Sequence, residues 1–206
     1  METKPTSPSA DPRLLRRRRL RFLGYALVAL LLVTSLSDRS GLFAYSGDDW
    51  RSFNGRSFRA MDVLDGDTFR IRTEDDQIVV VRLLGVDAPD PPSSHWSAEA
   101  SRYTTARLKD RTITLRLDGT QTRDGQRHLL AYVFITDTDN LNADIIRDGQ
   151  AYADRRMKHT FASTFEAGEA EARKRHRGLW KDVRDDMQPA WRQDWLRTLR
   201  QRRATT

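Results

Sequence analysis

Two short acidic segments carry the residues whose types and spacing indicate chemistry. One is Asp-Gly-Asp-Thr at 65–68, and the other is 82–90, which ends in Asp-Ala-Pro-Asp. Taken alone, the first is a favoured hairpin turn, and the second is a strand that enters a proline-terminated loop. If adjacent strands bring Asp67 and Asp87 together, the two carboxylates form a pair suited to a hard, oxygen-preferring cation such as Ca²⁺. Arg82 would then face a phosphate beside that ion.

The residues around these segments indicate an α+β domain with a small, strongly bent sheet. Stretches rich in β-branched and aromatic residues, separated by Asp/Gly turns, predict strands at 57–63, 69–72, 78–84, 113–117 and 129–135. Apolar periodicity predicts helices at 97–109, 141–148 and 161–175. Gly149 is expected to end the second of these helices and Gly178 the third.

The composition excludes several kinds of site. The chain has 206 residues, of which 38% are apolar and 32% are charged, and it contains no cysteine. Its length and apolar content predict one domain with a modest core, accompanied by tails. The absence of cysteine excludes disulfides, cysteine-ligated zinc or iron–sulfur centres, and a thiol nucleophile.

The net charge of +7 comes from an excess of basic residues at the two ends of the chain. Residues 1–40 carry eight Lys and Arg against three Asp and Glu, and residues 187–206 carry five against one. Residues 41–186 carry 23 basic against 25 acidic residues. A polyanion bound by this central part must therefore be held by local basic clusters or through a bound cation.

The N-terminal residues have the pattern of a membrane anchor or a signal peptide. A basic region at 1–21 precedes an uncharged run at 22–37, which as a helix would be about 24 Å long, slightly short of a hydrocarbon core of ~30 Å. The basic flank predicts a cytoplasmic N-terminus and an extracytoplasmic domain. The long basic region and the lack of an Ala-x-Ala site favour an uncleaved membrane anchor. Cleavage near the small residues Ser35 and Ser37 would instead release a secreted or periplasmic protein. Residues 38–56 are expected to form a linker.

Six motifs follow one another along the central part of the chain. They are DGDT at 65–68, RLLGVDAPD at 82–90, AEAS at 98–101, LAYV at 130–133, LN..II..G at 141–149 and AEAR....GLW at 170–180. In this order and spacing they resemble the staphylococcal nuclease (thermonuclease-like) family over roughly 57–182. The resemblance implies a five-stranded OB-fold β-barrel with flanking helices.

The resemblance also implies a Ca²⁺-dependent phosphodiesterase that attacks DNA and RNA with water and cleaves at the 5′ side of the scissile phosphate. Asp67 and Asp87 match the family's metal carboxylates, and Ala88 stands where a main-chain carbonyl also reaches the metal. Arg82 matches an arginine that stabilises the charge of the five-coordinate transition state. No protein partner is implied, and a monomer is expected.

Two positions depart from the family pattern. Asp90 stands where the family has a glutamate, often proposed as the general base, and its side chain is one methylene shorter. His128 stands at the family's second catalytic arginine, while Arg127 lies one residue early, and in a regular strand the two would face opposite sides. Either the turn delivers Arg127, or His128 replaces the arginine, or His128 only packs at the start of the strand. If His128 replaces it, activity should rise as the pH falls, because histidine carries positive charge only in acidic solution.

Other aromatic and histidine residues have weaker interpretations. Tyr152 is a weak candidate for a nucleotide contact. Trp180 is expected to close the core behind the last predicted helix. His95, His159 and His176 lack metal-ligand spacing and are expected to be solvated.

The basic C-terminal tail at 183–206 has an amphipathic pattern. Trp191, Trp195, Leu196 and Leu199 fall on one helical stripe amid arginines. Such a stripe would lie on an anionic membrane, bind nucleic acid or pack back on the domain.

Two functions from different classes follow from these observations. The first is a membrane-tethered or exported Ca²⁺-dependent nuclease. The alternative is a catalytically weak or inactive OB-fold module that binds nucleic acid or an envelope partner, favoured by the departures at two catalytic positions and by the slightly acidic central part. Metal-dependent cleavage of nucleic acid distinguishes the two.

Overall fold

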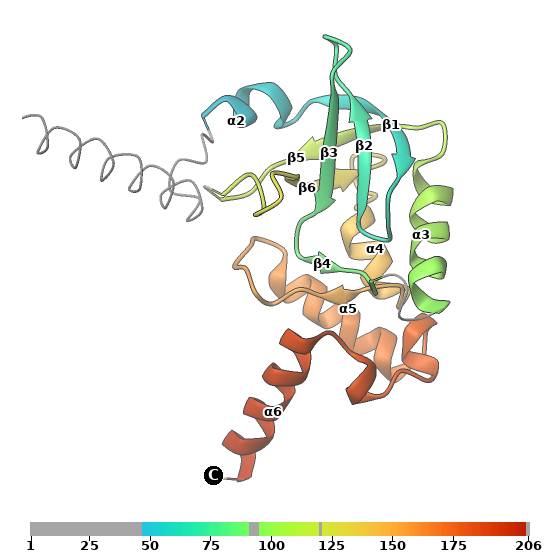
Figure 1. Ribbon diagram of the computed structural model, residues 1–206, viewed down its shortest axis with the longest axis vertical. Helices are drawn as coiled ribbons and strands as arrows, with labels where there is room; N and C mark the ends of the chain where they lie inside the picture. The colour runs from blue at the N-terminus through green and yellow to red at the C-terminus, as the bar shows by residue number, and fades with distance from the viewer. Residues whose placement is uncertain (1–46, 91–94, 120, 205–206) are drawn as a thin grey trace, which may run out of the picture. The chain divides into compact units, whose positions relative to one another are not determined.

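In the computed structural model of the protein, the described residues are 47–90, 95–119 and 121–204 (Figure 1). They belong to the unit that spans Tyr45–Thr206. The basic region and the hydrophobic run expected at 1–37 lie outside the described residues, so the anchor and the signal peptide stay predictions. Among the helices that are described, none is long and apolar enough to cross a membrane.

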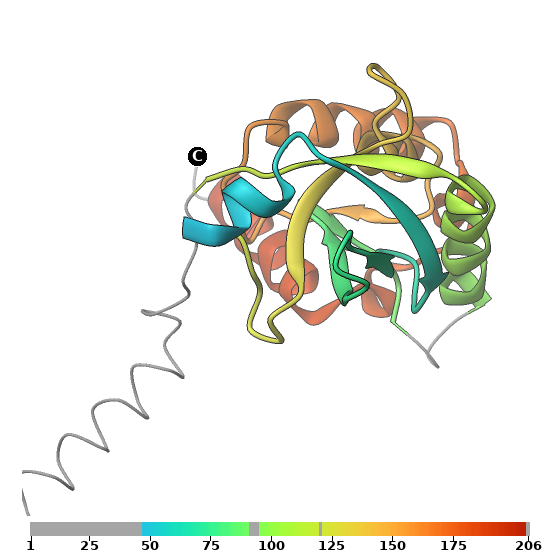
Figure 2. The ribbon, with the colours of Figure 1, turned by 90° about the horizontal axis from the view of Figure 1, so that it is seen from above.

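Five strands form a closed barrel that holds the main core (Figure 2). They are β1 (Ser57–Val63), β2 (Thr68–Arg72), β3 (Ile78–Leu83), β5 (Thr112–Arg116) and β6 (Leu129–Phe134). Their order round the barrel is β1-β2-β3-β6-β5, with β3 and β6 parallel and the other neighbours antiparallel. The predicted five-stranded barrel is confirmed, and each strand lies within about one residue of the limits expected from the sequence.

The helices in the described part of the chain lie beside the barrel and beyond one of its ends (Figure 1). They are α2 (Gly47–Phe53), α3 (His95–Leu108), α4 (Leu141–Arg147), α5 (Ala162–Lys174) and α6 (Ala190–Ala204), with the 3₁₀ turns η1 (Gly178–Lys181) and η2 (Asp185–Met187) between α5 and α6. Two short strands outside the barrel, β4 (Val86–Asp87) and β7 (Tyr152–Ala153), pair antiparallel. The helices α3, α4 and α5 correspond to the three that the sequence predicts.

Two segments differ from the sequence-based expectation. Part of the expected linker is the helix α2, because the side chain of Phe53 is buried in the main core. Gly178 begins η1 instead of ending α5, which stops at Lys174. A Cβ on Gly178 would lie 2.1 Å from the carbonyl oxygen of Gly149, so glycine is needed here because two backbone segments meet.

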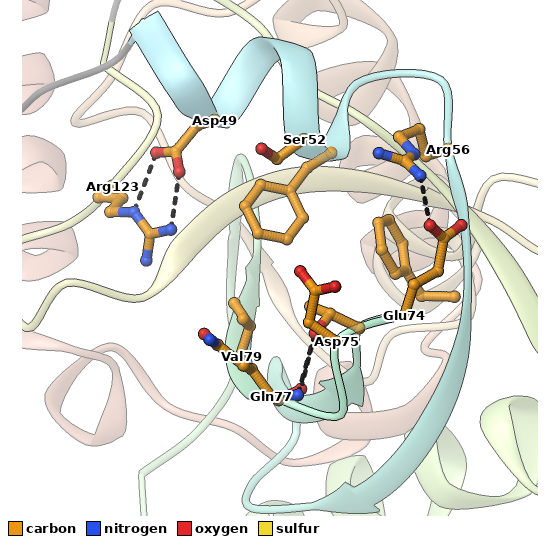
Figure 3. A pocket seen from close by; sticks show the side chains of 11 residues that line it. Asp49, Ser52, Arg56, Glu74, Asp75, Gln77, Val79 and Arg123 are labelled. Atoms are coloured by element: carbon orange, nitrogen blue, oxygen red, sulfur yellow. Dashed lines mark hydrogen bonds and ion pairs between the residues drawn. The ribbon is translucent and has the colours of Figure 1, made fainter.

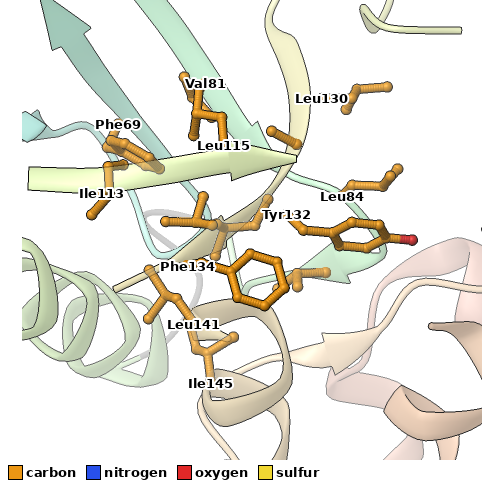
Figure 4. Packing of buried hydrophobic residues seen from close by; sticks show 14 of the residues in the cluster. Phe69, Val81, Leu84, Ile113, Leu115, Leu130, Tyr132, Phe134, Leu141 and Ile145 are labelled. Carbon is orange, nitrogen blue, oxygen red and sulfur yellow. The ribbon is translucent and has the colours of Figure 1, made fainter. Parts of the chain in front are cut away.

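The main core fills the barrel and continues to α4 (Figure 4). All six residues of β6 are buried. One face of this strand lies in the barrel interior, and α4 packs against the strand as well. The strand β1 instead alternates between buried and exposed positions over its first four residues, as a strand with one solvated face does. Leu141 and Ile145 of α4 are fully buried against the core.

A second buried cluster lies between α5, η1 and the start of α6. It contains Trp96, Tyr152, Ala172, Leu179 and Trp180, with Trp191 packed against it. Trp180 therefore closes the core behind α5, as the sequence predicts. Tyr152 is only 2% exposed, and its ring meets that of Trp180 edge to face at 5.4 Å, so it is not available for the nucleotide contact considered from the sequence.

Candidate active site

The turn before β2 fixes Asp67 against α3. The backbone N–H of Asp67 donates to Oδ1 of Asp65 at 3.0 Å, and the hydroxyl of Thr104 in α3 donates to the carbonyl of Gly66 at 2.6 Å. A Cβ on Gly66 would lie 2.6 Å from the Cβ of Ala88, so only glycine allows this approach. The Asp-Gly turn therefore also ties β2 to the residue that follows β4.

The carboxylate of Asp67 is 3% exposed and accepts hydrogen bonds at both oxygens. Oδ1 accepts from the hydroxyl of Thr68 at 2.7 Å. Oδ2 accepts from the backbone N–H of Ala88 at 2.8 Å and from Nη2 of Arg82 at 3.2 Å. The strands β2, β3 and β4 therefore all contribute to the position of this carboxylate.

Asp87, at the end of β4, accepts hydrogen bonds from three side chains. Its Oδ1 accepts from Nη2 of Arg82 at 3.1 Å and from Nη2 of Arg156 at 2.7 Å. Its Oδ2 accepts from Nε1–H of Trp191, in α6, at 2.9 Å. The structure thus brings Asp67 and Asp87 to the same nitrogen of Arg82, and adds two residues, Arg156 and Trp191, that the sequence did not place at this site.

Arg82 bridges the two carboxylates with a single nitrogen. Burial opposes its charge, but Asp67 and Asp87 together raise the pKa of Arg82 above its ordinary value. Its Nη1 and Nε have no hydrogen-bond partner among the residues that the structure describes. Arg82 therefore keeps donors for an anion while it holds both carboxylates.

The electrostatics of the two carboxylates favour a bound cation. Burial raises the pKa of Asp67 to about 7, against the opposing charge of Arg82. Burial also raises the pKa of Asp87, although the hydrogen bond from Trp191 and the charge of Arg156 oppose it. Both shifts mean that the neighbouring positive charge does not fully compensate for the loss of water, which a divalent cation would do.

The donor set at this place fits a hard cation. Two carboxylates and the adjacent main-chain carbonyl of Ala88 are oxygen ligands of the kind that Ca²⁺ takes, with water in its other positions. Within 47–90, 95–119 and 121–204, no three His, Asp or Glu side chains gather into a metal cluster. A metal ion held by Asp67 and Asp87 would therefore take its other ligands from the main chain and from water.

Asp90 follows Asp87 by three residues, at the end of the described segment 47–90. Its side chain is exposed and lines a hollow of about 220 Å³ together with Trp96, Tyr152 and Pro189. The residues that follow it, 91–94, are outside the described part of the chain. The structure thus leaves the side chain of Asp90 accessible to solvent.

The turn before β6 holds His128 on Asp124. Oδ1 of Asp124 accepts from the backbone N–H of His128 at 2.9 Å, and its Oδ2 lies 3.1 Å from Nδ1 of the same residue. Arg127 is exposed with φ at 67°, and its carbonyl accepts from Nη1 of Arg123 at 3.0 Å. Neither Arg127 nor His128 bonds to Asp67, Asp87 or Arg82 in the described structure.

Asp124 nevertheless lies close enough to Arg82 to raise its pKa electrostatically. The Asp124–His128 pair makes no hydrogen bond to Arg82 or to the two carboxylates among the described residues. Of the sequence-predicted residues, Asp67, Asp87, Ala88 and Arg82 come together, whereas no hydrogen bond among the described residues links Arg127 or His128 to them.

Two residues outside the sequence-predicted set bond to Asp87, and one histidine is less exposed than expected. Arg156 and Trp191 bond to Asp87, and the signal for Trp191 was its place on the amphipathic stripe of the tail, which packs back on the domain. Nothing in the spacing of Arg156 distinguished it from the other basic residues near it. His159, expected to be solvated, is half-buried, and its Nδ1 lies 3.0 Å from the hydroxyl of Tyr132. Burial lowers its pKa below the ordinary value.

One hollow of the described structure lies away from these carboxylates. It has a volume of about 340 Å³, lies between α2 and the turn that joins β2 to β3, and is lined by the ion pairs Arg56–Glu74 and Asp49–Arg123 (Figure 3). None of the sequence-predicted site residues lines it. Its polar groups are largely paired with one another, so the chemistry is better placed at Asp67 and Asp87.

Known proteins are similar to this chain over the same region. The family model described as "Staphylococcal nuclease homologue" matches residues 80–182. A "Micrococcal nuclease" of Shigella flexneri is 31% identical over 153 residues, which cover 69% of this chain and 82% of that protein. An "Uncharacterized endonuclease" of Escherichia coli O157:H7 is 29% identical over 135 residues, which cover 65% of this chain and 81% of that protein.

The barrel with its flanking helices and paired carboxylates defines an enzyme of the nuclease class. The match to the family model and to the Shigella flexneri protein shows that the chain belongs to the staphylococcal nuclease family.

Proposed function

We propose that this protein is a Ca²⁺-dependent nuclease that hydrolyses phosphodiester bonds of DNA, RNA or both. The observation that carries the proposal is the convergence of two buried carboxylates, Asp67 and Asp87, on one nitrogen of Arg82. In the reaction, the oxygen of water forms a bond to phosphorus while the bond from phosphorus to the 5′ oxygen breaks. The attacking water gives up one proton, and the 5′ oxygen takes up one proton from solvent as it leaves as an alcohol.

Asp67, Asp87 and the carbonyl of Ala88 would hold the Ca²⁺ ion. When bound, the ion supplies Lewis acidity to the phosphoryl oxygen and neutralises negative charge. Arg82 would donate its Nη1 and Nε groups to the phosphate and stabilise the charge that grows on it in the transition state. Asp90 would accept the proton of the attacking water, with a reach one methylene shorter than that of a glutamate.

A second candidate function, binding of nucleic acid without turnover, is favoured by one observation. Both oxygens of Asp87 already accept hydrogen bonds from protein side chains, namely Arg82, Arg156 and Trp191. A carboxylate so occupied is partly neutralised without a metal ion. In that case the fold would keep its affinity for a polyanion and lose the chemistry.

The test is hydrolysis of fluorescent single-stranded DNA and RNA oligonucleotides with Ca²⁺ and with EDTA. We expect cleavage that needs Ca²⁺ and that falls by at least about 100-fold in Asp87→Asn, since this change removes a charged metal ligand but keeps the shape of the side chain. The control Asp110→Asn alters an exposed carboxylate in the turn between α3 and β5 and should cleave as the wild type does. Tight binding that EDTA leaves unchanged, without cleavage, would establish the second candidate instead.

The N-terminal pattern would place this nuclease outside the cytoplasm, tethered to a membrane or released from it. The proposal is based on the basic region at 1–21 and the uncharged run at 22–37. The test is to fractionate cells that express the full chain and to measure the mass of the recovered protein, which distinguishes an intact chain from a cleaved one. Recovery of the intact chain in the soluble cytoplasmic fraction would contradict it.

A further inference from the structure

Two guanidinium groups approach the same oxygen of Asp87. Nη2 of Arg82 lies 3.1 Å from Oδ1, and Nη2 of Arg156 lies 2.7 Å from the same atom. Arg82 comes from β3, whereas Arg156 follows β7, which pairs with β4 so that Asp87 is opposite Tyr152. The short β4–β7 ladder therefore delivers a second cation to the site from a part of the chain far from both acidic motifs.

The position of Arg156 is fixed on two sides. Asp154 binds it in a bidentate manner, with Oδ1 at 2.9 Å from Nε and Oδ2 at 2.7 Å from Nη2. The guanidinium also lies over the ring of Trp191, 5.1 Å from the ring centroid. Because Nε1–H of Trp191 bonds to Oδ2 of Asp87, one aromatic side chain holds both the carboxylate and the cation.

The element that supplies Trp191 lies outside the part of the chain that matches the family model. That match ends at residue 182, and α6 begins at Ala190. The arrangement of Arg156 on Trp191 thus depends on this chain's own C-terminal helix.

Arg156 keeps donors for an anion. Its side chain is 47% exposed, and its Nη1 has no hydrogen-bond partner among the described residues. With Arg82, which also keeps free nitrogens, it forms a pair of guanidinium groups beside Asp87. A phosphodiester between two such groups would have donors at more than one of its oxygens.

The turn before β6 brings no cation to Asp87 in the described structure. His128 is bonded to Asp124 through its backbone and its ring, and Arg127 is exposed with no bond to either metal-binding carboxylate in the described structure. We infer that Arg156 is the second phosphate-contacting arginine of this nuclease, with Trp191 as the residue that positions it. The inference rests on the proposed function, because it assigns a role in that reaction.

The test compares Arg156→Met with Arg72→Met. Arg72 is a matched control, since its side chain is 50% exposed, is paired with one aspartate, and lies near the end of the β2–β3 hairpin, away from β4 (Figure 1). We expect Arg156→Met to lower kcat at saturating Ca²⁺ by about 100-fold with a change in KM below about threefold, as loss of a transition-state donor does. Arg156→Lys should recover part of the loss, and Arg72→Met should stay within about twofold of the wild type.

Binding provides a readout that needs no turnover. In EDTA, the anisotropy of a fluorescent 12-nucleotide single-stranded DNA gives Kd as a function of KCl concentration. Arg156→Met should flatten the plot of log Kd against log salt by about 0.7, the contribution of one phosphate contact on a single strand. Arg72→Met should leave this slope unchanged.

The outcomes separate this inference from the proposed function. If the wild-type protein shows no metal-dependent cleavage, the proposed function is wrong. If Arg156→Met then also leaves the salt slope unchanged, the inference about Arg156 is wrong as well. An active wild type with normal kcat in a folded Arg156→Met protein overturns the inference alone. A loss that excess Ca²⁺ restores would also overturn it, because Arg156 would then only hold Asp87 for the metal. Circular dichroism establishes that each variant is folded.

Discussion

Arginine and histidine offer different chemistry to a phosphate. A guanidinium is always charged and presents donors in a planar fork, whereas an imidazole presents at most two donors and is charged only in acidic solution. In this protein the ring of His128 is already used by Asp124, and that aspartate also accepts from the backbone N–H groups of Gln126 and His128. These contacts indicate that His128 mainly closes the turn before β6.

We predict that His128→Ala has only a small effect on kcat. The two backbone hydrogen bonds to Asp124 remain, so the turn should persist and kcat should change by less than about threefold, far below the ~100-fold effect of a lost transition-state donor. The measurement is kcat at pH 6 and pH 8 with saturating Ca²⁺, with His176→Ala as a control on another histidine. A loss of activity confined to pH 6 would show instead that protonated His128 acts on the phosphate.

The site residues that could be predicted from the sequence are those close together in the chain. Asp67 and Arg82 are 15 residues apart, on strands that pair directly, and the two motifs that contain them have recognisable spacing. Arg156 and Trp191 are 69 and 104 residues from Asp87. No periodicity links residues at such separations, because only the packing of β7 and α6 brings them to the carboxylate.

At the scale of elements, α6 is attached to the domain by a buried ion pair. Arg192 is fully buried, and its Nη1 lies 2.8 Å from Oε1 of Glu169 in α5. Its guanidinium also lies 5.1 Å from the ring centroid of Tyr152 and 5.2 Å from that of Trp180. The first turn of α6, which carries Trp191, is therefore held by a charge that has lost its water and depends on its partner.

Breaking this pair should be costly. Arg192→Ala leaves the carboxylate of Glu169 buried with Arg155 as its other cation, so we expect a loss of about 3 kcal/mol in the free energy of unfolding. The control Arg175→Ala breaks an exposed pair with Glu171 in the same helix and should cost no more than about 1 kcal/mol. Urea unfolding measures both. Adding Glu169→Gln to Arg192→Ala should recover part of the stability, and equal losses in the two single variants would contradict the argument.

Elements differ in how far their sequences predict them. The barrel strands carry enough β-branched and aromatic residues over five to seven positions to be identified with nearly correct limits. The strands β4 and β7 have two residues each, too few for any periodicity to be visible. The helix α2 has a mostly polar sequence, and its contact with the barrel depends mainly on the one large side chain of Phe53, so composition favoured a linker there.

At the scale of the whole molecule, both flanks of the predicted domain 57–182 belong to the folded unit. On the N-terminal side, Phe53 enters the core, and Asp49 binds Arg123 through two nitrogens at 2.9 and 2.7 Å. On the C-terminal side, α6 contributes Arg192 to the second cluster and Trp191 to Asp87. The two flanks thus differ, because only the second reaches the carboxylates.

This difference predicts distinct effects of removing each flank. Relative to the chain 45–206, both 57–206 and 45–182 should unfold at lower temperature, because each loses buried apolar surface and a buried ion pair. Only 45–182 should lose kcat, by about 100-fold, because Arg156 and Asp87 lose Trp191, whereas 57–206 should keep kcat within about twofold when the folded fraction is taken into account. Thermal unfolding followed by circular dichroism, with cleavage assays well below each transition, measures both quantities. Equal losses of kcat in the two shortened chains would mean that the C-terminal helix acts through stability and has no part in the site.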